Sequence, residues 1–436
     1  MTVLPFRRTV QMVPAEHRTN FWHLYLDIAW FGVLNGSAIS FMVIFATRLG
    51  ANGLQIGLLN AIPALVSLFF TLPAGHWLQN RSIRLGVFWM SLLNRLFYIT
   101  WIFLPLLLGA SGQIQALMGL VLIMSIPGTA LAVGFNALFA EAVPPEWRGH
   151  VAGVRNGLLA IVFVIVSLLC GFILEWLPFP LGYQVVFGLG FIGGMMSSYH
   201  LWFVRPVTGE TPRPMTNGHV NDLARPGHMR TVGDGRLAAV GLRFLTRLKQ
   251  PWLNLNLLRG PFGLILLLFF LFHFTQYLAI PLFPLYWVHQ LHLTDQEISL
   301  GIAVFYGAVL LGSSQLARLT RRLGNQHLFA VGVGAMSMYP ALTAVTDNLQ
   351  LFLITSAVGG LAWSLVGGAS ANYLLEKIPA DQRPSHLAWY NLALNAAVLG
   401  GSLLGPALAG AIGIVAALAL AAAGRFLAAI GLWRWG

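Results

Sequence analysis

Long apolar runs separated by short polar segments dominate the pattern of the chain. A helix needs about 20 mostly apolar residues to cross the hydrocarbon of a bilayer. The strands of a membrane barrel are shorter and alternate between apolar and polar residues, which these runs do not. We therefore predict an all-α polytopic membrane protein with twelve transmembrane helices, at residues 21–47, 54–75, 86–109, 114–140, 151–174, 183–204, 261–288, 296–317, 327–346, 350–374, 386–410 and 412–433.

The first run, at residues 21–47, is expected to remain in the protein as a transmembrane helix. It is longer than the apolar core of a signal peptide, which has about 7–15 residues. No clear cleavage site follows it, and the next apolar run begins at once.

Composition agrees with a membrane protein. Hydrophobic residues make up 57% of the 436-residue chain and charged residues only 9%, whereas soluble domains carry about 25% charged residues. The formal net charge of +12 does not form a basic patch on a soluble module, so nucleic acid is not expected as a partner. The single cysteine, Cys170, excludes an intramolecular disulfide and suggests no thiol metal site. We expect no metal and no cofactor.

Positive charges indicate the orientation in the membrane. Lys and Arg concentrate in every second loop and at both ends of the chain, while the intervening loops contain only Arg48. The positive-inside rule then places both termini in the cytoplasm. The predicted units are a cytoplasmic segment (1–20), an N-terminal six-helix bundle (21–204), a cytoplasmic linker with an amphipathic helix (205–260) and a C-terminal six-helix bundle (261–436).

A polar segment occurs twice at an offset of 235 residues. "EAVPPEWRGHVAGVRN" (141–156) joins the fourth and fifth runs, and "EKIPADQRPSHLAWYN" (376–391) joins the tenth and eleventh. This spacing predicts two parallel six-helix pseudo-repeats related by an axis along the membrane normal. We expect the loops to contain a cytoplasmic gate, although ordinary positive-inside loops are the alternative. The gate candidates are Glu141, Arg148, Glu376, Arg383, Arg84 and Arg322.

The layout and two loop motifs resemble the major facilitator superfamily over nearly the full length. The motifs are "GHWLQNRSIRLG" and "PPEWRGHVAGVRN". The first is similar to the superfamily's loop between spans two and three: Gly75, Leu78 and Arg84 match, but Gln79 stands where that loop has Asp. The resemblance implies transport by rocking of the two halves, around a cavity lined by spans one, four, seven and ten.

Ionisable residues inside predicted spans are candidates for function, because each costs at least about 2.5–3.5 kcal/mol to insert at a helix centre. Asp27, Arg95 and Arg155 all fall in the N-terminal half, where we expect that they can meet in its cytoplasmic portion, with Arg155 as the charge partner of Asp27. Asp27 then takes up a proton or belongs to a substrate site, or else the two form a structural pair. The resemblance implies that the third span supports the cavity from outside, so Arg95 is not expected to be a site residue, and its long side chain is expected to extend away from the bilayer centre.

Further polar and aromatic residues on the spans complete the predicted substrate site. Their alternative role is ordinary hydrogen bonding between helices, worth about 0.6 kcal/mol each. Their mixture of amides and aromatic rings favours a neutral or amphipathic solute over a polyanion. These candidates are Asn35, Asn136, His273, Gln276, Tyr277, Trp363, Asn391 and Asn395.

These observations favour a secondary active transporter of a small solute, in the plasma (inner) membrane. Its expected partners are the solute, the lipid bilayer and protons coupled through Asp27, and the expected state is a monomer. The motifs of nucleotide-binding, metal-dependent and serine-nucleophile enzymes do not occur, so no enzymatic activity and no catalytic residue are expected. A receptor or scaffold without net transport is the alternative.

Overall fold

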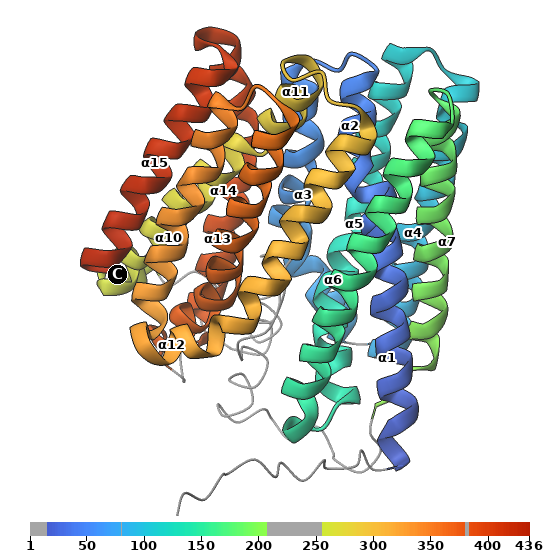
Figure 1. The fold of residues 1–436 in the computed structure, drawn as a ribbon. Coiled ribbons are helices and arrows are strands. Elements are labelled where there is room, and N and C mark those ends of the chain that lie inside the picture. The colour runs from blue at the N-terminus through green and yellow to red at the C-terminus, as the bar shows by residue number, and fades with distance from the viewer. Residues whose placement is uncertain (1–14, 80, 207–254, 380–382) are drawn as a thin grey trace, which may run out of the picture.

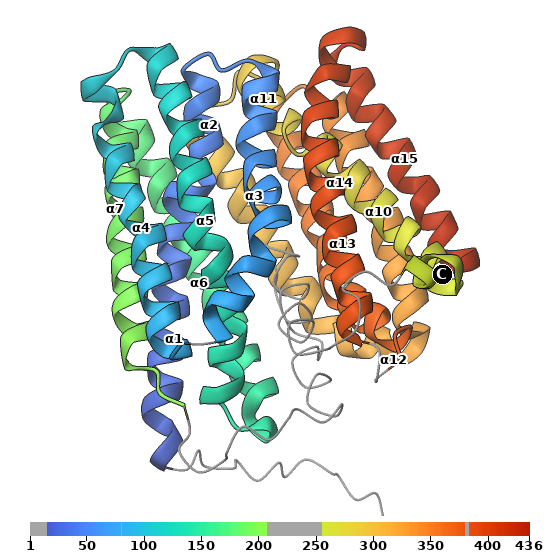
Figure 2. The ribbon, with the colours of Figure 1, turned by 180° about the vertical axis from the view of Figure 1, so that it is seen from behind.

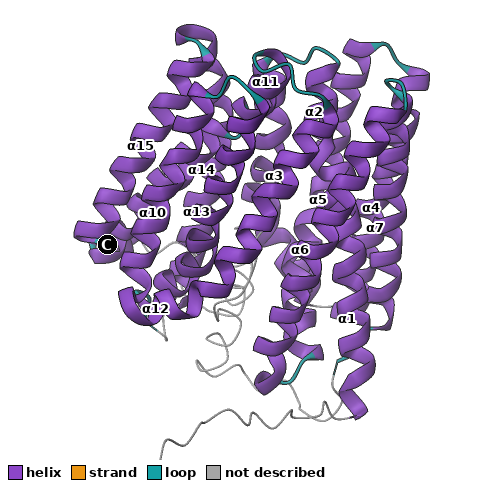
Figure 3. Ribbon diagram, in the orientation of Figure 1, coloured by secondary structure: helices purple, strands orange, loops and turns teal. Residues whose placement is uncertain are grey.

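The computed structural model describes residues 15–79, 81–206, 255–379 and 383–436. Each predicted apolar run lies in helix for nearly its whole length, and the described residues contain no strand (Figure 3). The elements are α1 (Ala15–Leu34), the π-helix η1 (Asn35–Ile39), α2 (Ser40–Arg48), α3 (Gly53–Gln79), α4 (Ile83–Leu107), α5 (Ala110–Ala142), α6 (Pro145–Trp176), α7 (Leu181–Phe203), the 3-10 helix η2 (Leu255–Arg259), α10 (Pro261–Ala279), α11 (Leu282–His289), α12 (Asp295–Val345), α13 (Leu349–Glu376), α14 (Arg383–Ile412) and α15 (Ile414–Trp435). The amphipathic helix predicted in the 205–260 linker and most of segment 1–20 lie outside the described residues.

Ten helical segments among the described residues are long and apolar enough to cross a membrane. Two features separate this number from the predicted twelve. The runs at 296–317 and 327–346 both lie in α12, which is interrupted only at Gly324, where φ is 75° and ψ is 166°. A positive φ favours glycine, so the chain turns there without strain. The other difference is α7, a 23-residue helix that is not among the ten.

The helices form two groups that lie side by side (Figures 1 and 2). We call α1–α7 the N-terminal group and α10–α15 the C-terminal group. Between them, α3 packs on α14, α6 on α12 and α2 on α11. One buried apolar cluster crosses this boundary, because Val288, Leu293 and Ile298 pack with the core of the N-terminal group.

Large apolar side chains cover the outward faces of the helices. Leu107, Trp176 and Leu311 are 75%, 74% and 71% exposed, and many others are similarly open. Soluble monomers rarely expose contiguous apolar surface of more than a few hundred Å². These faces are therefore suited to contact with lipid.

Prolines interrupt several of the helices and leave backbone carbonyls without their usual donor. A proline removes the N–H that would bond the carbonyl four residues earlier. In the predicted seventh span, α10 ends at Ala279 and α11 begins at Leu282, so the helix breaks at Pro281. In α12, Pro340 leaves the Met336 carbonyl without a helical partner.

Arg425 of α15 supplies the missing donor. Its Nη1 donates to the Met336 carbonyl at 2.9 Å, and its Nη2 donates to the Thr275 carbonyl at 3.3 Å. The side chain is only 1% exposed and forms no ion pair with any described residue. It therefore connects α15 to α12 and α10 through backbone oxygens alone.

The Arg425 contact leads to a prediction about stability. Pro340→Ala returns an N–H to Met336, so losing the guanidinium should matter less in that background. A double-mutant cycle of Arg425→Met with Pro340→Ala is expected to show a coupling of about 1–2 kcal/mol. Unfolding in detergent measures it, and strictly additive effects would contradict the assignment.

Candidate functional site

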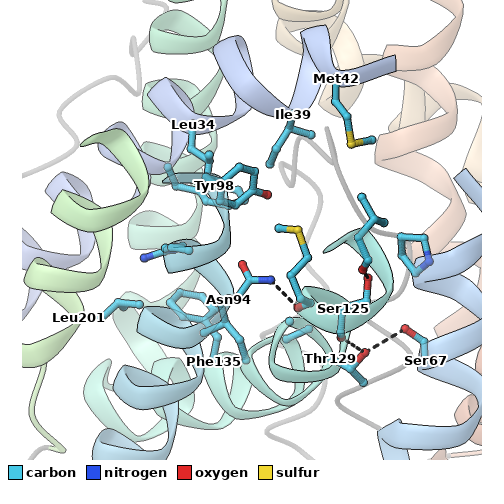
Figure 4. Close-up of a pocket in the computed structure, with 18 of the residues that line it drawn as sticks. Leu34, Ile39, Met42, Ser67, Asn94, Tyr98, Ser125, Thr129, Phe135 and Leu201 are labelled. Carbon is cyan, nitrogen blue, oxygen red and sulfur yellow. Dashed lines mark hydrogen bonds between the residues drawn. The ribbon is translucent and has the colours of Figure 1, made fainter. Parts of the chain in front are cut away.

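A cavity of about 370 Å³ lies inside the N-terminal group, among α1, α3, α4 and α5 (Figure 4). Small-molecule sites usually have volumes of about 300–1,000 Å³. Most of the wall is apolar. The charged, amide and aliphatic hydroxyl side chains on it are Asp27, Ser67, Asn94, Arg95, Ser125, Thr129 and Arg155.

One side of the cavity carries a row of neutral polar groups from three helices (Figure 4). Asn94 Nδ2 donates to the Met124 carbonyl at 2.8 Å. Thr129 Oγ1 donates to the Ser125 carbonyl at 2.9 Å and lies 3.4 Å from Ser67 Oγ. No described residue donates to Asn94 Oδ1. This polar side can therefore still bond a ligand.

The π-helix η1 sets which residues of the first span reach the cavity. Below it, Asp27, Phe31 and Leu34 line the wall at helical spacing; above it, the next lining residue is Ile39, five positions on. A π turn contains one residue more than an α turn, and such turns occur frequently at functional sites. Asn35, a predicted site residue, lies in this turn at 0% exposure, and neither amide atom has a partner among the described residues.

Asp27 and Arg155 form a buried ion pair at one end of the cavity. Arg155 Nη1 and Nη2 each lie 3.0 Å from Asp27 Oδ2. Ser197 Oγ of α7 donates to Asp27 Oδ1 at 2.5 Å, and Arg155 also donates to the Leu24 carbonyl. Both carboxylate oxygens are thus bonded, as a buried charge requires. The structure brings together the two residues that the sequence predicts to meet.

Arg95 of α4 also lines the cavity, whereas the resemblance implies a third span that supports the cavity from outside. Its Nη1 donates to the Gly194 carbonyl at 3.2 Å and to Ser198 Oγ at 2.9 Å. Ser198 Oγ lies 2.7 Å from Ser91 Oγ. These bonds hold the side chain at mid-helix depth, so it does not extend toward the membrane surface. Two adjacent serines of α7 therefore hold the two charged groups: Ser197 bonds Asp27, and Ser198 bonds Arg95.

An ion pair joins the two groups at the end of the molecule that carries α2 and α11 (Figure 1). Arg48 Nε and Nη2 each lie 3.0 Å from Asp295 Oδ1. Tyr183 OH donates to Asp295 Oδ2 at 2.7 Å. We call Arg48, Tyr183 and Asp295 the clamp. It connects the first span, α7 and the start of α12, and so bridges the N-terminal and C-terminal groups.

Close backbone packing accompanies the clamp between α3 and α14. Pro406 offers no N–H to the Ser402 carbonyl, and this oxygen faces Gly57 of α3. A Cβ at position 57 would lie 2.3 Å from it. Only glycine permits this approach, which places the Gly57 backbone against the carbonyl. The two groups are therefore in tight contact near the clamp.

Comparison with known families identifies the architecture. Residues 28–272 and 265–436 match the family model described as Major Facilitator Superfamily, and together they cover most of the chain. The chain belongs to this superfamily. It is a multi-pass membrane protein.

One curated relative of this superfamily member is the cis,cis-muconate transport protein of Acinetobacter baylyi (strain ATCC 33305 / BD413 / ADP1). The two are 24% identical over 278 residues, which is 63% of this chain and 61% of the relative. The match therefore spans less than two thirds of the length of that relative.

Solved transporter structures share the fold. The xylose transporter XylE from E. coli, in a partially occluded inward-open conformation, has a TM-score of 0.67 at 15% identity, covering 97% of this chain and 98% of the other. An auto-inhibited POT family peptide transporter has a TM-score of 0.66 at 15% identity, covering 97% and 96%. The nucleoside transporter NupG has a TM-score of 0.61 at 13% identity, covering 97% and 99%.

The predicted site residues of the C-terminal half lie apart from the cavity of the N-terminal group. His273 Nε2 lies 3.1 Å from Tyr390 OH, and Asn395 Nδ2 donates to Asn391 Oδ1 at 2.9 Å. These contacts connect helices or turns of the C-terminal group. The residues there that do not line the cavity are His273, Gln276, Tyr277, Trp363, Asn391 and Asn395.

In the N-terminal group, Asn136 of α5 is also off the cavity wall. Its Nδ2 donates to the Ala132 carbonyl of its own helix at 3.2 Å. The side chain is half-buried. Asn136 thus differs from Asp27 and Arg155, which do line the wall.

The candidates for a cytoplasmic gate have varied contacts. Arg148 donates to the carbonyls of Val143 at 3.0 Å and Ala140 at 2.5 Å, and so caps the end of α5. The Arg84 guanidinium lies 5.0 Å from the centroid of the Trp202 ring.

The second copy of the repeated loop makes a different contact. Glu376 Oε1 accepts from Asn325 Nδ2 at 2.5 Å, which connects α13 to α12. Arg322 is exposed. The side chain of Arg383, the predicted partner of Glu376, lies outside the described residues. Pairing of Glu141 with Arg148 and of Glu376 with Arg383 stays a prediction.

Proposed function

We propose that this superfamily member is a secondary active transporter that moves a small solute by alternating access and couples it to protons through Asp27. The observation that carries the proposal is the Asp27–Arg155 pair, buried on the wall of a solute-sized cavity. Intramembrane carboxylates are rare and mark proton or substrate pathways. A carboxylate paired with one arginine can change protonation as that pair opens and closes.

The proposed architecture has twelve spans in two parallel six-helix repeats. Such transporters bind solute between the repeats and expose it by rocking one against the other. The clamp and the Gly57 contact would be closed in the present arrangement and open in the alternate one. We further propose cytoplasmic termini, a plasma-membrane location and a monomer, on the basis of the charge distribution.

The similarity to the cis,cis-muconate transport protein supports the proposal that the solute is a small organic molecule. A receptor or scaffold without flux is the second candidate, favoured by one observation: Gln79 stands where the superfamily loop has Asp. Net solute flux separates the two functions.

Flux in liposomes tests the proposal. Solutes that raise the melting temperature of the purified protein are first identified, because ligands stabilise the state that binds them. With an imposed gradient of two pH units, one coupled proton per solute supports up to roughly 100-fold accumulation. Accumulation that collapses with a protonophore is expected. Binding without any flux would establish the receptor instead.

A further inference from the structure

Arg95 is a buried cation with an incomplete set of acceptors. A guanidinium has five N–H donors, yet both hydrogen bonds of Arg95 leave from Nη1. Its Nε is buried without a partner, although the side chain is only 3% exposed. It forms no ion pair with any described residue. Buried charges are normally paired, because an unpaired one is costly.

The charges on the cavity wall do not balance. Asp27 is matched by Arg155 at 3.0 Å, so the charge of Arg95 is left in excess. Protonation of Asp27 would raise the excess to two positive charges. In either state the cavity lacks at least one negative charge, and that charge would have to come from the ligand.

The remainder of the wall is suited to a mainly apolar ligand body. Leu34, Ile39, Met42 and Trp101 line it, and Phe31 lies with its ring centroid 5.8 Å from the Arg95 guanidinium. The row of Ser67, Asn94 and Thr129 provides neutral polar partners along another side. A ligand with one charged end and an apolar body fits both surfaces.

We propose that Arg95 binds the carboxylate of a small organic acid whose apolar body occupies the rest of the cavity. Arginine is suited to this role, since its planar fork bonds a carboxylate through two parallel N–H donors. The inference rests on the proposed function, because it takes this cavity as the site of the transported solute.

Binding to the full-length wild-type protein in detergent is the first test. Benzoate, cinnamate and hexanoate are each compared with their primary amides, which keep the shape and lose the charge. At least one acid is expected to raise the melting temperature while its amide does not. The proposal is overturned if no acid stabilises the protein, or if amides stabilise it as strongly as acids.

Substitution of Arg95 is the second test. Arg95→Gln should weaken binding of that acid by about tenfold or more, as expected for loss of a charge-assisted bond. Arg95→Lys should keep part of the affinity, because lysine keeps the positive charge but lacks the two parallel N–H donors of the guanidinium. This variant replaces Arg95→Gln in the test if the glutamine variant does not fold. Arg425→Gln, which removes another buried arginine outside the cavity, should leave the affinity unchanged. The proposal is overturned if Arg95→Gln and Arg95→Lys bind the acid as tightly as Arg425→Gln does.

Flux separates this inference from the proposed function. Acid binding that depends on Arg95, without flux in liposomes, would support the binding site and reject transport. Proton-driven flux of an uncharged solute that is unaffected by Arg95→Gln would support transport and reject the carboxylate site.

Discussion

Replacing Asp27 with asparagine is expected to abolish accumulation of solute against its gradient and to leave solute exchange in place. Asparagine has nearly the same shape, and its carbonyl can still accept from Ser197 or Arg155. It cannot take up or release a proton. A carrier without a titrating group still binds solute on both sides, so exchange persists while coupling to the pH gradient is lost. Both are measured with radiolabelled solute in liposomes.

The controls for Asp27→Asn must separate coupling from folding. Losing one member of a buried ion pair can cost about 3–5 kcal/mol, so the melting temperature of the variant is measured alongside flux. Ser197→Ala removes a hydrogen bond to the same carboxylate but keeps the acid, and it should retain accumulation. If Asp27→Asn accumulates solute as wild type does, Asp27 is structural, and uniport or coupling through the solute is favoured.

Removing the clamp is expected to open the end of the molecule where the two groups are joined. Asp295→Asn removes the charge that holds Arg48, and the amide cannot accept at both positions as the carboxylate does. The clamp is mostly buried, with side-chain exposures of 25% for Arg48 and 14% for Asp295. Loss of the clamp should raise the accessibility of this boundary to a thiol reagent on the order of tenfold, which corresponds to about 1.4 kcal/mol.

A cysteine at the boundary reports this opening. Val288 is 7% exposed and packs with the core of the other group, so Val288→Cys in a Cys170→Ser background gives a single reporter. Its rate of maleimide labelling should rise when Asp295→Asn is added. Asp347→Asn is the matched control, because Asp347 is an exposed acid on the same chain outside the clamp. Equal rates in all three proteins would show that the clamp does not hold the boundary closed.

The sequence predicted well what depends on local pattern. Apolar run length located the helices. The cost of a buried charge was enough to pair Asp27 with Arg155 across 128 residues. These features follow from composition and backbone chemistry, which a single sequence contains.

Features that depend on packing could not be predicted in the same way. Arg95 was expected to extend toward the membrane surface, but Gly194 and Ser198 hold it on the cavity wall. Arg48 appeared as a lone loop charge, although its partner lies 247 positions away. Arg425 falls inside the run at 412–433, and its contacts with the Met336 and Thr275 carbonyls explain its place there. Ser67, Asn94 and Thr129 carry no distinctive sequence signal, and the three-dimensional arrangement alone places them together.

The π-helix η1 has a consequence for insertions and deletions. Each residue of an α-helix turns the chain by about 100°. The π turn absorbs one extra residue, so that Leu34 and Ile39, five positions apart, both line the cavity. Deleting one residue within Asn35–Ile39 would restore a regular helix and leave α2 close to its present rotation relative to α1, so Arg48 would still face Asp295. A one-residue deletion within α1 or α2 would instead turn Arg48 away from Asp295 by about 100°. A deletion in the π turn should therefore be tolerated better than a deletion in the regular helix on either side of it.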